Sequence, residues 1–505
     1  MLFILENGNF TDSYRYNFAE AKTMIQENTS VVGKKIVLEK ISVFDIFKIC
    51  IGPSSSHTMG PWVAATTFIN SIEIAEINSI QVKLFGSLSK TGKGHGTDIA
   101  VMMGLSGYDF KTIDVHKVND YVVEIQNNSI LKLNENYSIP FKPDLNIEFL
   151  NERLPQHANA LTFIAELSNG EIIEETFYSI GGGFILQEGK DLTTKEQVEF
   201  PYPIQSEKDL LDHISKTGMN ISDVVLQNEL AIRNLSSIKK EIGAIWNVML
   251  ECIYKGCQTP GTLPGGLNVK RRAADINALL LKDEVSSNMQ EWMQLIKKSD
   301  QSFTNIIKWV SCFALAVNEE NASFGRIVTA PTNGAAGVIP AVLMYYLCFC
   351  ENKGDEDIQK FLMTAAEMGC LFKKGATISA AMGGCQAEIG VSSAMAAGAL
   401  TERMGGTPKQ VLMATEIAME HHLGLTCDPI MGLVQVPCIE RNTMGAIKAI
   451  TASQIALSSD PEMAKVSLDG IIKTMKETAM DMNDKYKETS EGGLAIHVSV
   501  NVPEC

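Results

Sequence analysis

The chain has 505 residues, which is too long for one ordinary hydrophobic core and predicts two or three domains. Hydrophobic residues make up 45% of it and charged residues 20%, a balance typical of a soluble globular protein. Its 43 basic and 59 acidic side chains give a net charge of −16, which argues against nucleic acid or an anionic membrane as the primary partner and favours a small-molecule ligand.

Cysteine usage and the apolar segments indicate a cytoplasmic protein. The chain has 11 cysteines, an odd number at irregular spacings, which fits a reducing compartment better than a disulfide scaffold. The N-terminus lacks the basic and apolar regions of a secretory signal. The apolar run 338–350 contains Pro340 and is too short to cross a bilayer, so we expect no membrane span.

The first half of the chain predicts a mixed α+β domain over residues 39–205. Residues 1–38 are polar and without pattern, and we treat them as an N-terminal extension of unknown role. An apolar stretch from Lys40 is then broken by a Gly-Pro-Ser-Ser-Ser turn. Short runs that alternate or are rich in β-branched residues predict strands at 80–86, 121–125, 146–150 and 171–180.

The second half, residues 206–505, predicts an all-α domain. From Ile221 to Thr478 the apolar residues recur at helical spacing, in Ala- and Met-rich segments separated by Gly and Pro. The chain end is the exception, because apolar residues alternate from Leu494 to Val502 and predict a terminal strand. Such a strand carries Cys505, the last residue, away from the last helix.

Three internal cysteines lie in turn-prone Gly/Pro surroundings rather than on an apolar helix stripe. Cys385 stands in GGCQAE, Cys427 in LTCDP and Cys438 in VPCIER, and Cys505 is a fourth thiol at the terminus. No CxxC pair is present, so spacing alone is a weak signal for a metal. A buried cysteine is usually a small hydrophobe, and we interpret the other cysteines in that way. The surroundings of these three favour ligation.

Three histidines stand in loops of the first domain. His57 lies in GPSSSHTMG, His95 in TGKGHGTD, and His157 in LPQHANAL, with Asn159 two residues further on. A single histidine is more often structural, but three in such loops of one domain predict contact with a ligand.

Other candidate anion sites are less specific. GSLSKTGKG has five residues between Gly86 and Gly92 where a phosphate-binding P-loop has four, so we reject that motif. The glycines 181–183 predict a tight turn. The basic run 270–272 can bind a carboxylate or begin a solvated helix, and the sequence leaves both open.

Eight motifs together resemble the single-chain, iron–sulfur-dependent L-serine dehydratases over residues 39–505. This resemblance implies an allosteric-substrate-binding-like β domain, related to a substrate-binding domain of a class of phosphoglycerate dehydrogenases, followed by a large all-α catalytic domain. It also implies L-serine ammonia-lyase activity, which yields pyruvate and ammonia in amino-acid degradation. The motifs are IGPSSSHTMGP, GSLSKTGKGHGTDIA, YSIGGGF, LPGGLNVKRRA, FALAVNEENA, TAPTNGAAGVIPA, GLTCDPI and VPCIERN.

The resemblance implies a [4Fe–4S] cluster as Lewis acid, held by the three internal cysteines, with Cys505 as a resting-state fourth ligand that substrate must displace. It implies a histidine base, either His95 or His157, with Asn159 and His57 orienting the base or binding substrate. The backbone of Ser54, Ser55 and Ser56 is expected to bind the substrate carboxylate, and Lys270 is a further substrate-binding candidate.

Two other functions remain open at this point. A pyridoxal-phosphate dehydratase can catalyse the same net reaction through a lysine, for which Lys90 and Lys270 are the candidates. A non-enzymatic amino-acid sensor is the second alternative. A homodimer is the expected assembly for a soluble enzyme of the serine dehydratase kind.

Overall fold

The computed structural model describes residues 40–134, 137–190, 199–282 and 284–498, all within one compact unit. The predicted N-terminal extension and Cys505 therefore lie outside the described residues. Within the described ranges, every helix is too short or too polar to cross a membrane.

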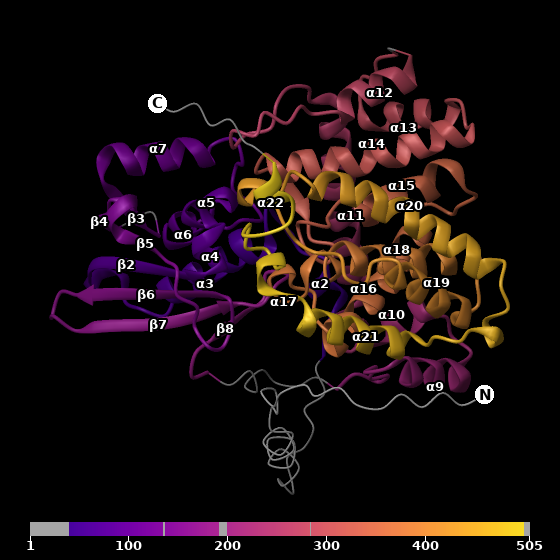
Figure 1. Cartoon of the computed structure of the whole chain (residues 1–505), viewed down its shortest axis with the longest axis horizontal. Coiled ribbons are helices and arrows are strands. Elements are labelled where there is room, and N and C mark those ends of the chain that lie inside the picture. Colours follow the sequence, from indigo (N-terminus) through magenta and orange to yellow (C-terminus); the bar gives the residue numbers. More distant parts are fainter. Residues whose placement is uncertain (1–39, 135–136, 191–198, 283, 499–505) are drawn as a thin grey trace, which may run out of the picture. The chain divides into compact units, whose positions relative to one another are not determined.

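The first part of this unit, residues 40–190, is built on a five-stranded sheet and is called the β half below (Figure 1). The strand order is β5-β2-β6-β7-β8; β2 pairs in parallel with β5, and the other neighbours are antiparallel. Ile80, Val82 and Leu84 on β2 are fully buried, which explains the alternation of this strand. The strands are β2 (Ile77–Gly86), β5 (Ile147–Leu150), β6 (Asn159–Leu167), β7 (Ile172–Ser179) and β8 (Ile185–Gln187).

Short helices and two small strand pairs surround this sheet. The predicted strands at 80–86, 146–150 and 171–180 are confirmed, and each coincides with one of the strands just named. The helices are α2 (Val43–Ile46), α3 (Gly60–Ile69), α4 (Ser87–Lys90), α5 (Gly92–His95), α6 (Thr97–Leu105), α7 (Val118–Asn128) and α8 (Pro143–Asn146), and β3 (Ile130–Leu133) pairs with β4 (Tyr137–Pro140).

The predicted strand at 121–125 is wrong, because these residues lie inside α7. Val118 and Ile125, two helical turns apart, are its buried residues, whereas Val123 between them is exposed. The β-branched residues in this run favour a strand by propensity. Burial of one helical face outweighs that preference, so the segment is a helix.

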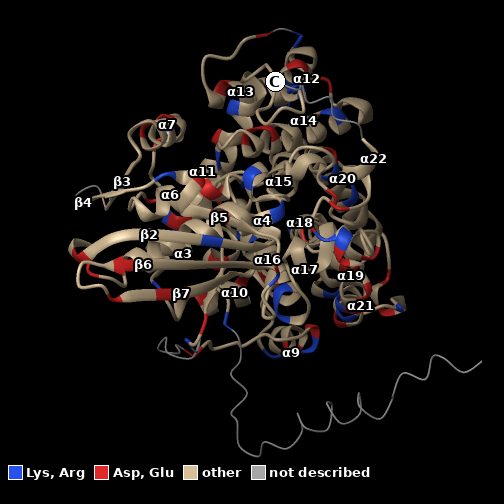
Figure 2. Cartoon of the chain, turned by 60° about the vertical axis from the view of Figure 1, so that its left-hand side comes forward, with Lys and Arg blue, Asp and Glu red and all other residues tan. Residues whose placement is uncertain are grey.

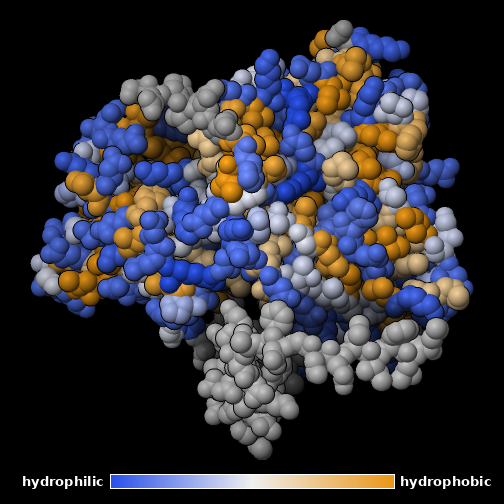
Figure 3. Space-filling view, in the orientation of Figure 1, coloured by the Kyte–Doolittle hydropathy of each residue, from blue (hydrophilic) through white to orange (hydrophobic). Residues whose placement is uncertain are grey.

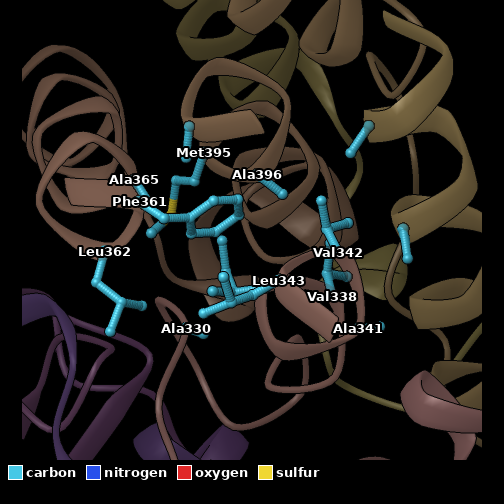
Figure 4. Close-up of a cluster of buried hydrophobic side chains, with 14 of the residues drawn as sticks. Ala330, Val338, Ala341, Val342, Leu343, Phe361, Leu362, Ala365, Met395 and Ala396 are labelled. Atoms are coloured by element: carbon cyan, nitrogen blue, oxygen red, sulfur yellow. The ribbon is translucent and has the colours of Figure 1, made fainter. Parts of the chain in front are cut away.

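The remaining part, residues 207–498, is the helical half, and α18 lies at its centre. Nearly every residue of α18 is buried, and its Ala, Gly and Ser side chains let α16, α19 and α20 pack closely against it. Figure 4 shows Met395 of α18 beside Phe361 of α16 and Leu343 of α15 in this core.

Helices account for most of the helical half, as predicted. They are α9 (Glu207–Thr217), α10 (Ile221–Leu230), α11 (Leu235–Gln258), α12 (Ala273–Leu281), α13 (Met289–Lys298), α14 (Phe303–Ala322), α15 (Val338–Phe349), α16 (Asp355–Gly375), α17 (Ala380–Gly383), α18 (Ile389–Arg403), α19 (Pro408–Glu420), α20 (Cys438–Leu457), α21 (Leu468–Asp481) and α22 (Leu494–His497). Charged residues of both signs are interspersed along the elements in the view of Figure 2.

Two features depart from an all-α second half. The short strand β9 (Arg326–Val328) pairs antiparallel with β1 (Ile49–Ile51) of the β half and joins the two halves through backbone hydrogen bonds. The predicted terminal strand is wrong at Leu494–His497, which form α22, and its residues 499–502 lie outside the described residues. The N–H of Leu494 donates to Asp428 Oδ2 at 2.6 Å, and the side chains of Leu494 and Ile496 are exposed. The alternation therefore reflects no strand pairing at these residues. Figure 3 shows hydrophobic residues at several places on this face of the molecule.

Candidate active site

The loops that carry His57 and His95 are bound to each other by threonine hydroxyls. Thr58 Oγ1 donates to the backbone carbonyl of His95 at 2.7 Å, and Thr97 Oγ1 donates to that of His57 at 2.6 Å. The two imidazole rings consequently stack, with their centroids 4.5 Å apart.

His57 lies in the first turn of a helix that continues into α3. It belongs to a π-helical turn, η1 (Ser55–Met59), which Ser54 caps by accepting the backbone N–H of His57. The first N–H groups of a helix have no partner inside it, so those of Ser55 and Ser56 remain as donors at this end. Ser54 itself lines the cavity described below. This geometry suits the predicted carboxylate-binding role of the serine turn.

Both ring nitrogens of His57 are engaged. Nδ1 lies 2.9 Å from Ser56 Oγ, and Nε2 lies 3.0 Å from Ser87 Oγ. Because Ser87 Oγ donates to the carbonyl of Glu488, it accepts from His57 Nε2–H, which leaves Nδ1 as an acceptor. Burial, with the neighbouring His95, holds the pKa of His57 well below its ordinary value. The ring is therefore a neutral, fixed element of the site.

His95 has one free nitrogen. Its Nδ1 donates to the carbonyl of Thr91 at 2.8 Å, which fixes the tautomer and leaves the lone pair on Nε2. Nε2 is buried and has no hydrogen-bond partner among the described residues, and His95 lines the cavity. Burial lowers the pKa of His95 to about 4, so the ring is neutral near pH 7. These are the properties of a base that awaits a proton.

His157 and Asn159 support the neighbouring sheet end. His157 Nδ1 accepts the backbone N–H of Asn159 at 3.0 Å, and the Asn159 side chain donates to the carbonyl of Ser179 at 3.3 Å. Asn159 pairs with Gly86, directly before Ser87. Burial lowers the pKa of His157 to about 4. Neither side chain lines the cavity, in contrast to His95.

Cys385, Cys427 and Cys438 come together although they lie on three separate segments. Cys427 and Cys438 line a small cavity that also receives His95 and Ser54. The ligand atoms of Cys385, Cys427 and Glu388 lie within 4.8 Å of one another, and all three residues are buried. The structure thus brings the three internal cysteines to the same place as the free nitrogen of His95, which joins the chemistry of the two halves.

Arg441 on α20 supplies a positive charge to the cysteines. Its Nη1 donates to Cys385 Sγ at 3.3 Å and its Nη2 to Asp428 Oδ1 at 3.0 Å. A hydrogen bond from Cys427, together with Arg441, lowers the pKa of Cys385 to about 7 against the effect of burial. The hydrogen bond with Cys385 raises the pKa of Cys427, and burial raises that of Cys438. The first thiolate therefore forms at Cys385.

Two buried carboxyl groups complete the cavity wall, and the sequence analysis missed both. Burial, then the nearby Cys385, raises the pKa of Glu388 to about 8. Glu488 Oε1 lies 3.5 Å from His57 Nδ1 and 3.8 Å from His95 Nε2. Burial, with Glu388 and Cys385, raises its pKa well above the ordinary value. Glu388 follows Cys385 by three residues, which was a usable signal. Glu488 sits in the polar run KYKETSEGG, which predicts only a solvated loop.

The basic run 270–272 does not reach the cavity lining. Lys270 is exposed and pairs through its backbone with Thr262. Arg271 forms buried ion pairs with Glu319 and Glu320, and Arg272 pairs with Glu440. The two arginines are therefore already bound to protein carboxylates, and the structure contradicts an open carboxylate site at them. Lys90, the other lysine considered for pyridoxal phosphate, forms an ion pair with Glu491 at the surface.

Comparison with known proteins assigns the chain to a family. Residues 42–190 match the family described as serine dehydratase beta chain, and residues 216–495 match serine dehydratase alpha chain. The chain belongs to the serine dehydratase family. It is 46% identical to the L-serine dehydratase of Streptomyces coelicolor over 92% of this chain and 100% of that protein. It is 44% identical to L-serine dehydratase 1 of Escherichia coli and to L-serine dehydratase of Helicobacter pylori, in each case over 91% of this chain and 99% of the relative.

These matches confirm the family resemblance predicted from the sequence motifs. They also give the order of the two halves, because the region matching the serine dehydratase beta chain precedes the helical region matching the alpha chain. His95 lies in the region that matches the beta chain and Cys438 in the region that matches the alpha chain. A complete cavity therefore requires both regions of the serine dehydratase chain.

Proposed function

We propose that this chain is an L-serine dehydratase, a lyase that converts L-serine into pyruvate and ammonia. Near-complete alignment with several L-serine dehydratases supports the substrate and reaction. The observation that carries the proposal is the free Nε2 of buried His95 on the same small cavity as Cys427 and Cys438. Dehydration of serine needs a base for the α-proton and assistance for a poor leaving group, and the two sides of the cavity are suited to these tasks.

The cysteines fit an iron–sulfur group. Iron–sulfur clusters are held by cysteine thiolates, and Cys385, Cys427 and Cys438 offer three buried sulfurs with the Arg441 guanidinium to compensate their charge. We therefore assign a [4Fe–4S] cluster to these residues; Cys505, the proposed fourth ligand, lies outside the described residues. When bound, the cluster supplies Lewis acidity that assists departure of the substrate hydroxyl.

The protein's own groups account for binding and proton transfer. The N–H groups of Ser55 and Ser56 at the start of the helix bind the substrate carboxylate. His95 Nε2 then accepts the α-proton, and His57 keeps the ring of His95 in place by stacking. Loss of the α-proton and of the hydroxyl gives 2-aminoacrylate, which tautomerises and is hydrolysed to pyruvate and ammonia. We assign His95 rather than His157 as the base because His157 does not line the cavity.

The proposal extends to the setting of the enzyme. We expect a cytoplasmic homodimer that acts in amino-acid degradation, with a β half related to allosteric substrate-binding domains. Light scattering on the purified chain tests the assembly, and a twofold subunit mass is the expected result.

Product analysis tests the activity directly. Anaerobically purified chain incubated with L-serine is expected to release pyruvate and ammonia in equal amounts. If pyruvate does not form while serine remains intact, the proposed activity is wrong. Release of pyruvate that requires added pyridoxal phosphate instead supports the lysine-based alternative.

A further inference from the structure

Glu488 is held in the cavity wall by its backbone, between the two catalytic sides of the site. Its N–H donates to the carbonyl of Cys427 at 2.9 Å, and its carbonyl accepts Ser87 Oγ at 2.9 Å. Its backbone adopts a left-handed φ of 58°, which is uncommon for a residue with a side chain. Contacts from both halves therefore fix this carboxyl at one position, with 4% of the residue exposed.

The surroundings of the Glu488 carboxyl are rich in acceptors. Oε1 faces His57 Nδ1 at 3.5 Å and His95 Nε2 at 3.8 Å. The lone pair of His95 Nε2 is open, because the Nδ1–H of that ring donates to Thr91, whereas His57 Nδ1 already accepts from Ser56 Oγ. Oε2 is buried and has no hydrogen-bond partner among the described residues. A carboxylate buried in such surroundings is disfavoured until a cation with several N–H donors pairs with it.

A substrate ammonium group has these properties, whereas a bound metal ion is a poorer fit. An ammonium ion carries one positive charge and three donors, and charge-assisted hydrogen bonds to a carboxylate are the stronger kind. His57 has both nitrogens engaged by serine hydroxyls, so it is not available as a metal ligand. In an α-amino acid the ammonium nitrogen is bonded to Cα. Its binding at Glu488 thus brings the α-proton next to His95 Nε2.

We propose that Glu488 binds the α-ammonium group of the substrate and makes the site specific for α-amino acids. This inference rests on the proposed function for its choice of substrate class. Glu488 acts here as a substrate-binding residue. It disfavours binding of carboxylic acids that have no amino group.

Two unreactive ligands that differ only in the ammonium group test this role. L-alanine and propanoate both lack the hydroxyl, so their binding is measured by titration calorimetry without turnover. The variants are Glu488→Gln, which keeps the shape and removes the charge, and Glu488→Asp, which keeps the charge with a shorter reach. Glu491→Gln is the matched control, because Glu491 lies on the same segment but is half exposed and pairs with Lys90. Iron content and thermal unfolding are matched between samples before binding is compared.

We expect wild type and Glu491→Gln to bind L-alanine at least about tenfold more tightly than propanoate. In Glu488→Gln this ratio is expected to fall towards one through loss of L-alanine binding alone, and Glu488→Asp is expected to lie between. The proposal is overturned if the ratio in Glu488→Gln stays at the wild-type value, even when turnover of L-serine falls. It is equally overturned if wild type does not distinguish the two ligands.

Turnover of L-serine separates failure of this inference from failure of the proposed function. If wild-type protein prefers L-alanine but forms no pyruvate from L-serine, the proposed reaction is wrong and the role of Glu488 in binding an ammonium group stands. If the protein forms pyruvate from L-serine without preferring L-alanine to propanoate, the proposed reaction stands and the role assigned to Glu488 is wrong.

Discussion

Arg441 Nη1 lies 3.3 Å from Cys385 Sγ, and the same guanidinium binds Asp428 Oδ1 through Nη2. Cys438 and Arg441 are both in the first turn of α20, so one helix supplies a thiol and a charge that stabilises another thiolate. The position of this helix therefore links the stability of the loop around Asp428 to the charge state of the cysteines.

Replacing Arg441 with Gln is expected to lower both the free energy of unfolding and the retention of iron. Loss of the guanidinium leaves Asp428 buried without its ion pair, which costs about 3 kcal/mol of unfolding free energy. It also removes a charge that favours the Cys385 thiolate, so less iron is retained after anaerobic gel filtration. Urea unfolding and iron analysis measure the two effects.

A double variant separates the effect on stability from the effect on iron retention. Arg441→Gln with Asp428→Asn is expected to recover part of the unfolding free energy but not the iron, because Cys385 still lacks its cation. Arg272→Gln is the control, since Arg272 pairs with Glu440 at a half-exposed position and its loss costs less than about 1 kcal/mol. Full iron retention in Arg441→Gln contradicts the role assigned to Arg441.

Replacing His95 with Asn is expected to abolish most turnover. The Asn amide can replace the Nδ1–H donor to Thr91, but it removes the basic Nε2. Loss of a general base lowers kcat by about 10²- to 10⁴-fold with a smaller change in KM. His157→Asn is the comparison, and its kcat is expected to fall much less. The opposite order in a pyruvate-release assay assigns the base to His157 instead.

We expect His422 to lower the free energy of unfolding in acid. Its Nδ1 donates to the carbonyl of Ala418 at 2.6 Å, and burial lowers its pKa to about 4. An unfolded histidine titrates near 6.5. Between these values the unfolded chain binds a proton that the folded chain does not, so the free energy of unfolding decreases as pH falls from about 6.5 towards 4.

Substituting His422 with Asn removes this proton uptake and keeps an N–H donor. The decrease in unfolding free energy between pH 7 and pH 4.5 is expected to be smaller in His422→Asn, by up to about 3 kcal/mol. Urea unfolding at both pH values measures the difference. Equal decreases in the two proteins rule out His422 as a source of the acid sensitivity.

Gly493 is expected to tolerate no side chain. Its φ is +61°, and a Cβ there lies 2.2 Å from Asp428 Oδ2, the oxygen that accepts the N–H of Leu494. Gly218 has a similar φ of +70° with open space around it, which makes Gly218→Ala the matched control. Gly493→Ala is expected to cost about 2–4 kcal/mol and Gly218→Ala about 1–2 kcal/mol in urea unfolding. Equal costs mean that backbone strain alone accounts for the loss.

Local pattern predicted the elements, and pairing over long distances decided the site. Alternation predicted β2, and helical spacing predicted most of the second half. The serine turn, His95 and the three cysteines were recognisable by their Gly- and Pro-rich surroundings. The tautomer of His95 and the buried position of Glu488 depend on partners that no local pattern reveals; Ser87 and Glu488, for example, are 401 residues apart in sequence.

The strand predictions that failed did so for a related reason. Residues 121–125 have strand propensity, but burial of Val118 and Ile125 on one face requires a helix. Leu494 alternates with polar neighbours, but its N–H is bound by Asp428, which a helical turn permits. In both cases tertiary contacts overrode a preference of about 1 kcal/mol or less per residue.

The central claim is that His95 and a cysteine-held iron–sulfur group act on L-serine in one cavity. The most direct test measures pyruvate release against bound iron while anaerobic wild-type chain is loaded stepwise with iron and sulfide. We expect turnover to rise in proportion to bound iron, to level off at about four irons per chain, and to be absent in iron-loaded His95→Asn. Rapid pyruvate release from colourless, iron-free chain contradicts the account.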